Sequence, residues 1–320
     1  MYFDKITKKV VLEEGKVVPL SNDLVFKNVV KNVVNRDFLA KIINLVTGID
    51  YDYLFRNMIV IDADIPDKSI FVHHNEQDVV VTIDNKYINV EMSNDKAKNK
   101  RKNEITSHKY ASSMYVKGSD YSESYIFYQI AIENYNIFKN SDLVIEVGLT
   151  DLKNGEIETD EFRKFHVNLK NIPDKCYNEL SERERYFKLF LIDDIEELDK
   201  ISMGDDIMKK VVETVKSLSS DPIFMSELEK QQLDEYCSAM AIVDAKKEGK
   251  QEGKAEGKKE EKIEIARNML AKNSDVQFIS ECTGLSIDEI NNLWYLRVSF
   301  FLIIFIKYYK IYMWFIWMDY

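Results

Sequence analysis

Two acidic residues, Asp78 and Glu91, are the residues whose types and spacing best suit metal chemistry. Asp78 is the first residue of the segment DVVVTI, and Glu91 is the last but one of YINVEM. Both segments are rich in β-branched residues, and their patterns predict two strands. If Asp84 and Asn85 form a two-residue turn, Asp78 lies directly opposite Glu91. Opposed carboxylates have Cβ atoms about 4.5–5.5 Å apart and repel each other unless a cation compensates. The spacing therefore predicts a Mg²⁺ site, which Mn²⁺ could also fill.

The two faces of this hairpin differ in character. One face is wholly apolar and is predicted to lie in the core: Val79, Val81, Ile83, Ile88, Val90 and Met92. The other face carries both acids: Asp78, Val80, Thr82, Tyr87, Asn89 and Glu91. Two alternatives stay open. A three-residue turn would move Glu91 opposite Val79, and both acids could lie on a solvated sheet face that binds no metal.

A third acid and a basic run could complete a site for DNA. Asp23 opens the first predicted helix, where it could join the metal ligands or serve only the helix N-terminus. The run KAKNKRK follows Glu91 closely in a chain that is otherwise acidic, and Lys and Arg contact DNA phosphates through charge-assisted hydrogen bonds. Its basic residues are Lys96, Lys98, Lys100, Arg101 and Lys102. The alternative for this run is a solvated helix start.

The histidines form no metal motif. His73 and His74 are neighbours in an extended segment, so their side chains point to opposite sides and suit joint ligation of one ion poorly. His108 and His166 have no motif around them. The predicted metal ligands are therefore carboxylates.

The elements that would position these residues follow an α/β order. Ser21, Asn22 and Asp23 are helix-capping residues ahead of LVFKNVVKNVV, and the next helix, RDFLAKIINLVT, ends at Gly48. Strands are predicted between residues 57 and 92, and a longer helix from Lys96 to about Lys117. Further strands are predicted in YIFYQIAIE, LVIEVGL and FRKFHVNL.

Helical periodicity dominates beyond Pro173. The segment AKKEGKQEGKAEGKKEEK repeats every four residues, which places its glutamates and its lysines in separate rows along one helix. Its glycines each cost about 1 kcal/mol relative to alanine in a helix. A solvated, semi-rigid helix is therefore predicted for this segment.

The segment SDVQFISECTGLSIDEINNL predicts two short helices around Gly284. Ser286 and Glu289 have the spacing of a capping box at the start of the second helix. The pair fits a helix-turn-helix or a plain helical hairpin. No basic residue lies in the second helix, which favours the plain hairpin.

The composition limits what the chain can do. A formal net charge of −11 excludes coating nucleic acid by bulk electrostatics, so any DNA contact must be local. The 45% hydrophobic content is enough for a substantial core. Cys176, Cys237 and Cys282 lack paired spacing and are predicted to be ordinary buried thiols. No apolar run of signal-peptide length opens the chain, which predicts a cytoplasmic location.

A hydrophobic tail from Val298 to Trp317 stands apart from the rest. It is long enough to span a bilayer. Lys307 and Lys310 lie near its centre, however, and their cost leaves insertion close to balance. An incidental extension is therefore favoured over a membrane anchor.

Taken in order, these residues resemble the recombination-promoting nucleases, also called PD-(D/E)XK nuclease family transposases. The likeness covers roughly residues 20–140, the charged helix and the LSIDEINNL ending. Family members open with Asn-Asp-x-x-Phe-Lys, matched here by Asn22, Asp23, Phe26 and Lys27. An aspartate-led strand follows, matched by Asp78, and then a strand ending Ile-Glu-Met-Gln or similar, matched by NVEMS with Glu91. A later series with fixed spacing is matched by Arg101, Tyr110, Gly118 and Tyr121.

The resemblance implies a restriction-endonuclease-like mixed sheet flanked by helices, Mg²⁺-dependent DNA cleavage, and a role in recombination or mobile elements. The third position of the E-x-K motif is Ser93, where the superfamily has Lys and this family commonly Gln. Serine cannot supply a charge to orient the attacking water. Lys96 or Lys98 could substitute for it. Otherwise the chain is a catalytically inactive DNA-binding or assembly protein that retains the nuclease fold.

The predicted organisation therefore has six parts and DNA as its partner, and it is compatible with a homo-oligomer. The parts are a leader (1–20), the nuclease-like core (21–172), a helical extension (173–245), the charged Glu-Gly-Lys helix (246–264), a small helical hairpin (265–296) and the hydrophobic tail (297–320). Asp78, Glu91 and Ser93 are the predicted catalytic residues. The predicted metal ligands are Asp78, Glu91 and Asp23. The predicted DNA contacts are Lys96, Lys98, Lys100, Arg101, Lys102 and Tyr110.

Overall fold

The chain divides into two compact units, Met1–Leu233 and Asp234–Tyr320, in a computed structural model. The structure describes residues 2–4, 7, 9–61, 78–95, 105, 108, 125–139 and 141–293. The predicted basic run with Tyr110, the helix expected from Lys96, the pair His73 and His74, and the hydrophobic tail all lie outside the described residues, apart from isolated positions at 105 and 108.

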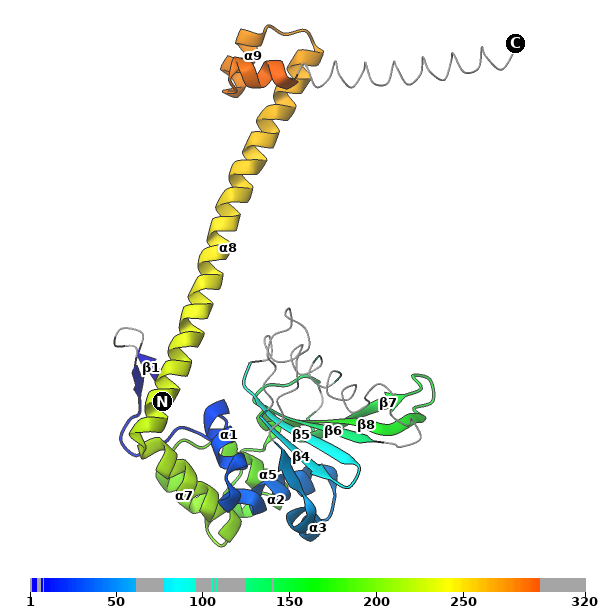
Figure 1. The fold of residues 1–320 in the computed structure, drawn as a ribbon, viewed down its shortest axis with the longest axis vertical. Helices are drawn as coiled ribbons and strands as arrows, with labels where there is room; N and C mark the ends of the chain where they lie inside the picture. Colours follow the sequence, from blue (N-terminus) through cyan, green and yellow to red (C-terminus); the bar gives the residue numbers. More distant parts are fainter. Residues whose placement is uncertain are drawn as a thin grey trace, which may run out of the picture. The chain divides into compact units, whose positions relative to one another are not determined.

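The first unit is built on a six-stranded sheet with the order β3-β4-β5-β6-β8-β7 (Figure 1). The strands are β3 (Ile59–Ile61), β4 (Val79–Ile83), β5 (Lys86–Ser93), β6 (Ile126–Glu133), β7 (Val144–Thr150) and β8 (Ile157–Asn168). The three central strands, β5, β6 and β8, run parallel, and the pairs β3/β4, β4/β5 and β7/β8 are antiparallel. The predicted α/β class with a mixed sheet flanked by helices is confirmed.

The β4–β5 hairpin has the register predicted from a two-residue turn. Val79 pairs with Val90 and Ile83 pairs with Lys86, which leaves only Asp84 and Asn85 in the turn. Asp84 adopts a φ of 51°, in the left-handed region that Asp tolerates better than most residues. The three-residue turn is therefore wrong. The apolar face of the hairpin lies in the main hydrophobic core, as expected.

Helices α1 (Asp23–Lys31) and α2 (Arg36–Thr47) cover this apolar face (Figure 1). Both begin where the sequence predicts, and α2 also ends as predicted, but α1 ends at Lys31, before the last residues of LVFKNVVKNVV, and η1 (Val33–Asn35) follows it. The side chain of Asn22 caps α1 by accepting from the backbone N–H groups of Leu24 and Val25, and Gly48 ends α2 with a φ of 77°. These caps fix where α1 starts, and therefore where Asp23 and Lys27 stand relative to the sheet.

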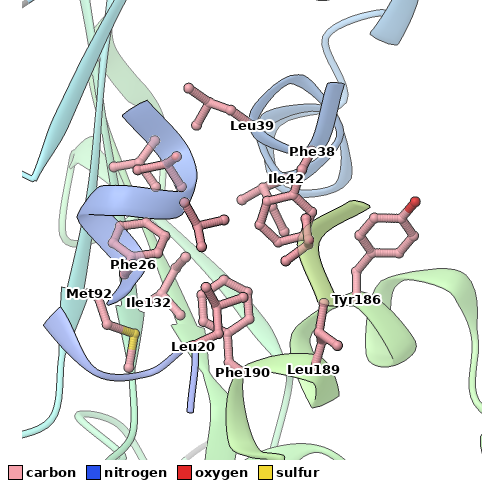
Figure 2. Packing of buried hydrophobic residues seen from close by; sticks show 14 of the residues in the cluster. Leu20, Phe26, Phe38, Leu39, Ile42, Met92, Ile132, Tyr186, Leu189 and Phe190 are labelled. Carbon is pink, nitrogen blue, oxygen red and sulfur yellow. The ribbon is translucent and has the colours of Figure 1, made fainter. Parts of the chain in front are cut away.

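The core continues into segments on both sides of the predicted nuclease region. Leu20 of the leader and Phe190 of a later helical turn pack with Phe26, Met92 and Ile132 (Figure 2). The later elements are α5 (Glu182–Lys188), η4 (Leu189–Leu191), α6 (Ile195–Ser202) and α7 (Asp206–Ser220). The leader and the start of the helical extension therefore share one core with the sheet. The remaining elements of this unit are β1 (Tyr2–Asp4), β2 (Lys9–Val11), η1 (Val33–Asn35), α3 (Tyr51–Asn57), η2 (Leu169–Asn171) and η3 (Tyr177–Glu179).

A single long helix, α8 (Pro222–Ala271), contains the Glu-Gly-Lys repeat. Every residue from 237 to 262 is exposed, which confirms the prediction of a solvated helix. None of the helices in the described ranges is long and apolar enough to cross a membrane.

The end of α8, helix α9 (Val276–Thr283) and helical residues 287–293 enclose a small separate core. Its buried members are Ala266, Ile279, Leu285 and Ile290. Gly284 ends α9 with a φ of 66°. Ser286 and Glu289 form the predicted capping box, because each side chain accepts a hydrogen bond from the backbone N–H of the other residue.

The cysteine prediction was wrong. Cys176, Cys237 and Cys282 are free thiols as expected, but all three are exposed rather than buried. Cys237 lies on the solvated part of α8, and Cys282 on the outer side of α9 next to the buried Thr283. Burial was predicted because cysteine is usually a buried residue type. Cys237 and Cys282 are exposed because they lie on the solvent-facing sides of helices.

Candidate active site

The face of the sheet opposite α1 and α2 is polar at its centre. In the three parallel strands, residues paired across the sheet point to the same side. Glu91 is thereby aligned with Ala131 and His166, Asn89 with Gln129 and Lys164, and Ser93 with Glu133 and Asn168. Most of these polar side chains are buried: Asn89, Glu91, Ser93, Gln129, Glu133, His166 and Asn168. Buried polar groups are costly unless hydrogen-bonded or paired, so this layer is a candidate functional site.

Asp78 and Glu91 lie together at one edge of this layer. Asp78 is 3% exposed and Glu91 is 2% exposed, so the alternative of a solvated sheet face is wrong. An oxygen of Asp78, Oδ2, accepts the backbone N–H of Met92 at 2.7 Å. Burial raises the pKa of Asp78 well above its ordinary value, and the nearby charges of Glu91 and then Asp23 raise it further. The two acids therefore form a buried pair that a cation would stabilise.

Lys27 places a positive charge beside this acid pair. Its Nζ lies 3.2 Å from Oδ1 of Asp78 and 3.1 Å from Oδ2 of Asp23. Burial lowers the pKa of Lys27, but the carboxylates of Asp78 and Asp23 outweigh it and raise the pKa above its ordinary value, so the ammonium stays charged. Asp23 belongs to the first turn of α1 and is also joined to the acid pair through Lys27. Its place at the helix N-terminus is confirmed, and its role as a metal ligand stays a prediction.

Glu91 is oriented by an amide network. Nδ2 of Asn89 donates to Oε1 of Glu91 at 3.1 Å and to Oε1 of Gln129 at 3.1 Å. Among the described residues Oδ1 of Asn89 is buried and has no hydrogen-bond partner. A buried acceptor of this kind needs a partner, and the acid pair beside it is where a hydrated cation would supply one.

Sequence reasoning missed a second buried pair on this face, His166 and Glu133. Nδ1 of His166 lies 3.0 Å from Oε2 of Glu133, and their side chains are 5% and 1% exposed. The hydroxyl of Tyr135 donates to Oε1 of Glu133 at 3.4 Å. The alternation in FRKFHVNL could have indicated this position, because it puts His166 on the side opposite Phe165 and Val167. The other described histidine, His108, is exposed, and its ring packs against Phe162.

The donor set at the acid pair fits Mg²⁺. The described residues contain no group of three or more His, Cys, Asp or Glu side chains arranged around one metal position. Mg²⁺, however, commonly keeps several waters and is bound by one or two carboxylates together with substrate phosphates. Asp78 and Glu91 offer these oxygens, and their buried like charges favour a divalent cation. Ser93 is buried on the same face and hydrogen-bonds with Tyr135, so it supplies no charge.

Acidic pH is expected to stabilise the metal-free protein through Asp78. Its raised folded-state pKa means that the folded protein binds an extra proton between the unfolded value of about 3.9 and the folded value. The contribution of Asp78 to stability therefore falls as pH rises through that window and is constant above it. Chemical denaturation of wild type and Asp78→Asn at several pH values measures the difference. The raised pKa would be contradicted if the free energy of unfolding of wild type, relative to that of Asp78→Asn, increased with rising pH.

Fold and site together define a class: a mixed six-stranded α/β sheet flanked by helices, of the kind found in nucleases, with a buried acid pair on its polar face. The comparison with family models agrees with this class. Residues 259–293 match the model described as "Rpn/YhgA-like nuclease family, C-terminal HTH domain". The matched stretch contains every member of the small core around Ile279. It supports a relationship to the Rpn family and a nuclease-related protein.

The family match also corrects one prediction. The helices around Gly284 were expected to be a plain hairpin, with a helix-turn-helix as the alternative, and the match favours the helix-turn-helix. The plain hairpin was preferred because the last helix lacks basic residues, but the fold depends on the buried apolar residues rather than on surface charge. No curated protein and no solved structure gave a significant match to the chain.

Proposed function

We propose that the protein is a Mg²⁺-dependent DNA endonuclease linked to recombination or mobile elements. The observation that carries the proposal is the buried pair of Asp78 and Glu91 on the polar face of a nuclease-like sheet. Structural sheets seldom bury two like charges beside each other, because each ion loses its hydration. A site that binds a cation and a phosphate explains the arrangement.

The chain's own residues would prepare this site in distinct ways. Asp78 and Glu91 would hold the ion, and Asp23 would extend the acidic cluster from the first turn of α1. A bound Mg²⁺ or Mn²⁺ would lower the pKa of a water and offset charge on the scissile phosphate. The backbone N–H of Met92 and the amide of Asn89 orient the two carboxylates before any ion arrives.

Lys27 supports an active enzyme despite Ser93. The E-x-K motif of the superfamily places a positively charged side chain near the acid pair, and the sequence suggested Lys96 or Lys98 for that role. Lys27 already places an ammonium 3.2 Å from Asp78. It would supply the charge that Ser93 cannot, from α1 rather than from β5.

DNA would be held by regions outside the acid pair. The basic residues from Lys96 to Lys102, with Tyr110, are the proposed contacts to the backbone. The helix-turn-helix match at residues 259–293 adds a second candidate DNA-binding unit. Its last helix carries Asp288 and Glu289 and no lysine or arginine among residues 287–293, so we expect a small contribution from that helix.

A catalytically inactive DNA-binding or assembly protein is the second candidate. The observation in its favour is Ser93, which is buried and hydrogen-bonded rather than poised as a charged group. This candidate predicts DNA binding without cleavage under every metal condition.

Incubation of the purified full-length protein with supercoiled plasmid separates the two candidates. The reactions contain Mg²⁺, Mn²⁺ or EDTA. We expect nicked and linear plasmid with either ion and intact plasmid with EDTA. Binding of the plasmid without cleavage in all three reactions would favour the inactive protein and would refute the endonuclease.

A further inference from the structure

The pair formed by His166 and Glu133 is the feature of the polar face that the acid pair does not explain. Its side chains are 5% and 1% exposed, and they come from neighbouring parallel strands, β8 and β6. Glu133 holds one end of the imidazole, at Nδ1. Nε2, at the other end, makes no hydrogen bond to the residues that the structure describes and is not one of the buried side-chain atoms that lack a partner, so this nitrogen is open to a ligand.

The contact with Glu133 selects one form of the imidazole. Oε2 of Glu133 can only accept when the carboxylate is ionised, so Nδ1 of His166 must carry the proton that joins them at 3.0 Å. In the neutral ring, Nε2 then holds an unshared electron pair. This is the arrangement of a base whose orientation is fixed by a carboxylate behind it. The ring of Phe138 packs against the imidazole in a T-shaped arrangement, with the two ring centroids 5.4 Å apart.

His166 stands in line with Glu91 across the sheet. Both residues pair with Ala131, one from each side of β6, and their Cα atoms are therefore about 9.5 Å apart. All three side chains lie on the polar face. Ala131 carries only a methyl group, so no larger side chain of β6 separates the carboxylate of Glu91 from the imidazole. A water and a phosphate oxygen have the size to bridge groups at this separation.

We propose that His166 is the general base of the cleavage reaction and that Glu133 is its positioning residue. This inference rests on the proposed endonuclease function. His166 Nε2 takes a proton from the attacking water as the water oxygen bonds to phosphorus. The phosphorus–oxygen ester bond breaks, and the leaving oxygen takes a proton from solvent.

Few groups face His166 among the residues that the structure describes. Glu133 and Tyr135 face it from β6 and the segment after it, and Lys164 shares its face on β8. Glu91 faces His166 across Ala131. On β7, the antiparallel neighbour of His166 is the uncharged Ile145. In the described part of the chain, Glu133 is therefore the one charged group in direct contact with the imidazole.

The first test is made on the metal-free, full-length protein. Nitrogen NMR of protein labelled in its histidines reports which ring nitrogen is protonated, and the spectrum of His166→Asn assigns the signal. We expect the neutral ring of His166 to carry its proton on Nδ1, with Nε2 unprotonated. A proton on Nε2 would overturn the proposal, because that nitrogen could then accept nothing.

The second test measures cleavage. In His166→Asn the amide nitrogen replaces Nδ1 and keeps the hydrogen bond to Glu133, but nothing replaces Nε2. General acid–base groups contribute about 10²–10⁴-fold, so we expect the rate to fall at least about 100-fold while DNA affinity is unchanged. The acidic limb of the rate–pH profile should disappear. In Glu133→Gln an amide oxygen still accepts from Nδ1, so the acidic limb should remain with a smaller loss of rate.

Matched measurements separate this inference from the function on which it rests. His108→Asn, at an exposed histidine, is expected to cleave like wild type. If wild type cleaves and His166→Asn keeps both its rate and its acidic limb, only the assignment of His166 is wrong. If wild type fails to cleave plasmid with either ion, the endonuclease and the general base are both refuted.

Discussion

Replacing Glu91 or Asp78 with its amide is expected to abolish divalent-dependent plasmid nicking. Glu91→Gln and Asp78→Asn keep the size of the side chains but remove the charge that would hold Mg²⁺. Loss of an outer partner of a metal ligand commonly costs about 10- to 100-fold in affinity or activity, so loss of the ligand itself should cost more than about 100-fold. Nicking rates with Mg²⁺ and with Mn²⁺ measure the effect.

The amides are better tests than alanine because both acids are buried. Asp78 accepts the backbone N–H of Met92 and pairs with Lys27, so Asp78→Ala would leave the N–H of Met92 without this acceptor and Lys27 paired with Asp23 alone. In metal-free protein Glu91→Gln should be at least as stable as wild type, since it removes a like charge beside Asp78. Glu158→Gln, an exposed acid on β8, is the matched control. Equal nicking by Glu91→Gln and Glu158→Gln would remove Glu91 from the site.

The hairpin could be predicted because its determinants are local. The alternation of residues 79–83 and 86–93 and the turn at Asp84 fix the register, and the register alone opposes Asp78 and Glu91. The caps at Asn22 and Gly48 are equally local. What the local pattern could not show was burial. Whether one face of a hairpin meets solvent depends on the strands beside it, and here β6 adds Gln129 and Glu133 to the same face.

The rest of the site depends on contacts between distant parts of the chain. Lys27 follows Asp23 by one helical turn, so the contact between them could have been predicted from their spacing. The contact of Lys27 with Asp78, however, depends on how α1 packs on the sheet. His166 meets Glu133 only because β6 and β8 pair in parallel, with β7 returning to the outer edge. A single sequence does not determine parallel pairing, because the strands are joined by long connections rather than by a turn.

Neutralising the basic run is expected to weaken DNA binding strongly and to reduce its salt dependence. The variant carries Gln in place of Lys98, Lys100, Arg101 and Lys102. Each lost phosphate contact should lower the slope of log affinity against log salt by about 0.9, because fewer counterions are released. Because the chain has a net charge of −11, few other groups can replace this local attraction. DNA affinity measured by fluorescence anisotropy over a range of salt concentrations gives the slope.

A control with the same change of charge decides what a fall in affinity means. Lys246, Lys247, Lys250 and Lys254 lie on the exposed part of α8, and their replacement by Gln removes four charges far along the sequence from the acid pair. If the basic run contacts phosphate, only the first variant flattens the salt slope. Equal flattening in both variants would mean that net charge alone governs binding. An unchanged slope in the first variant would return the run to a solvated helix start, and the helix-turn-helix unit would then be the remaining candidate for DNA binding.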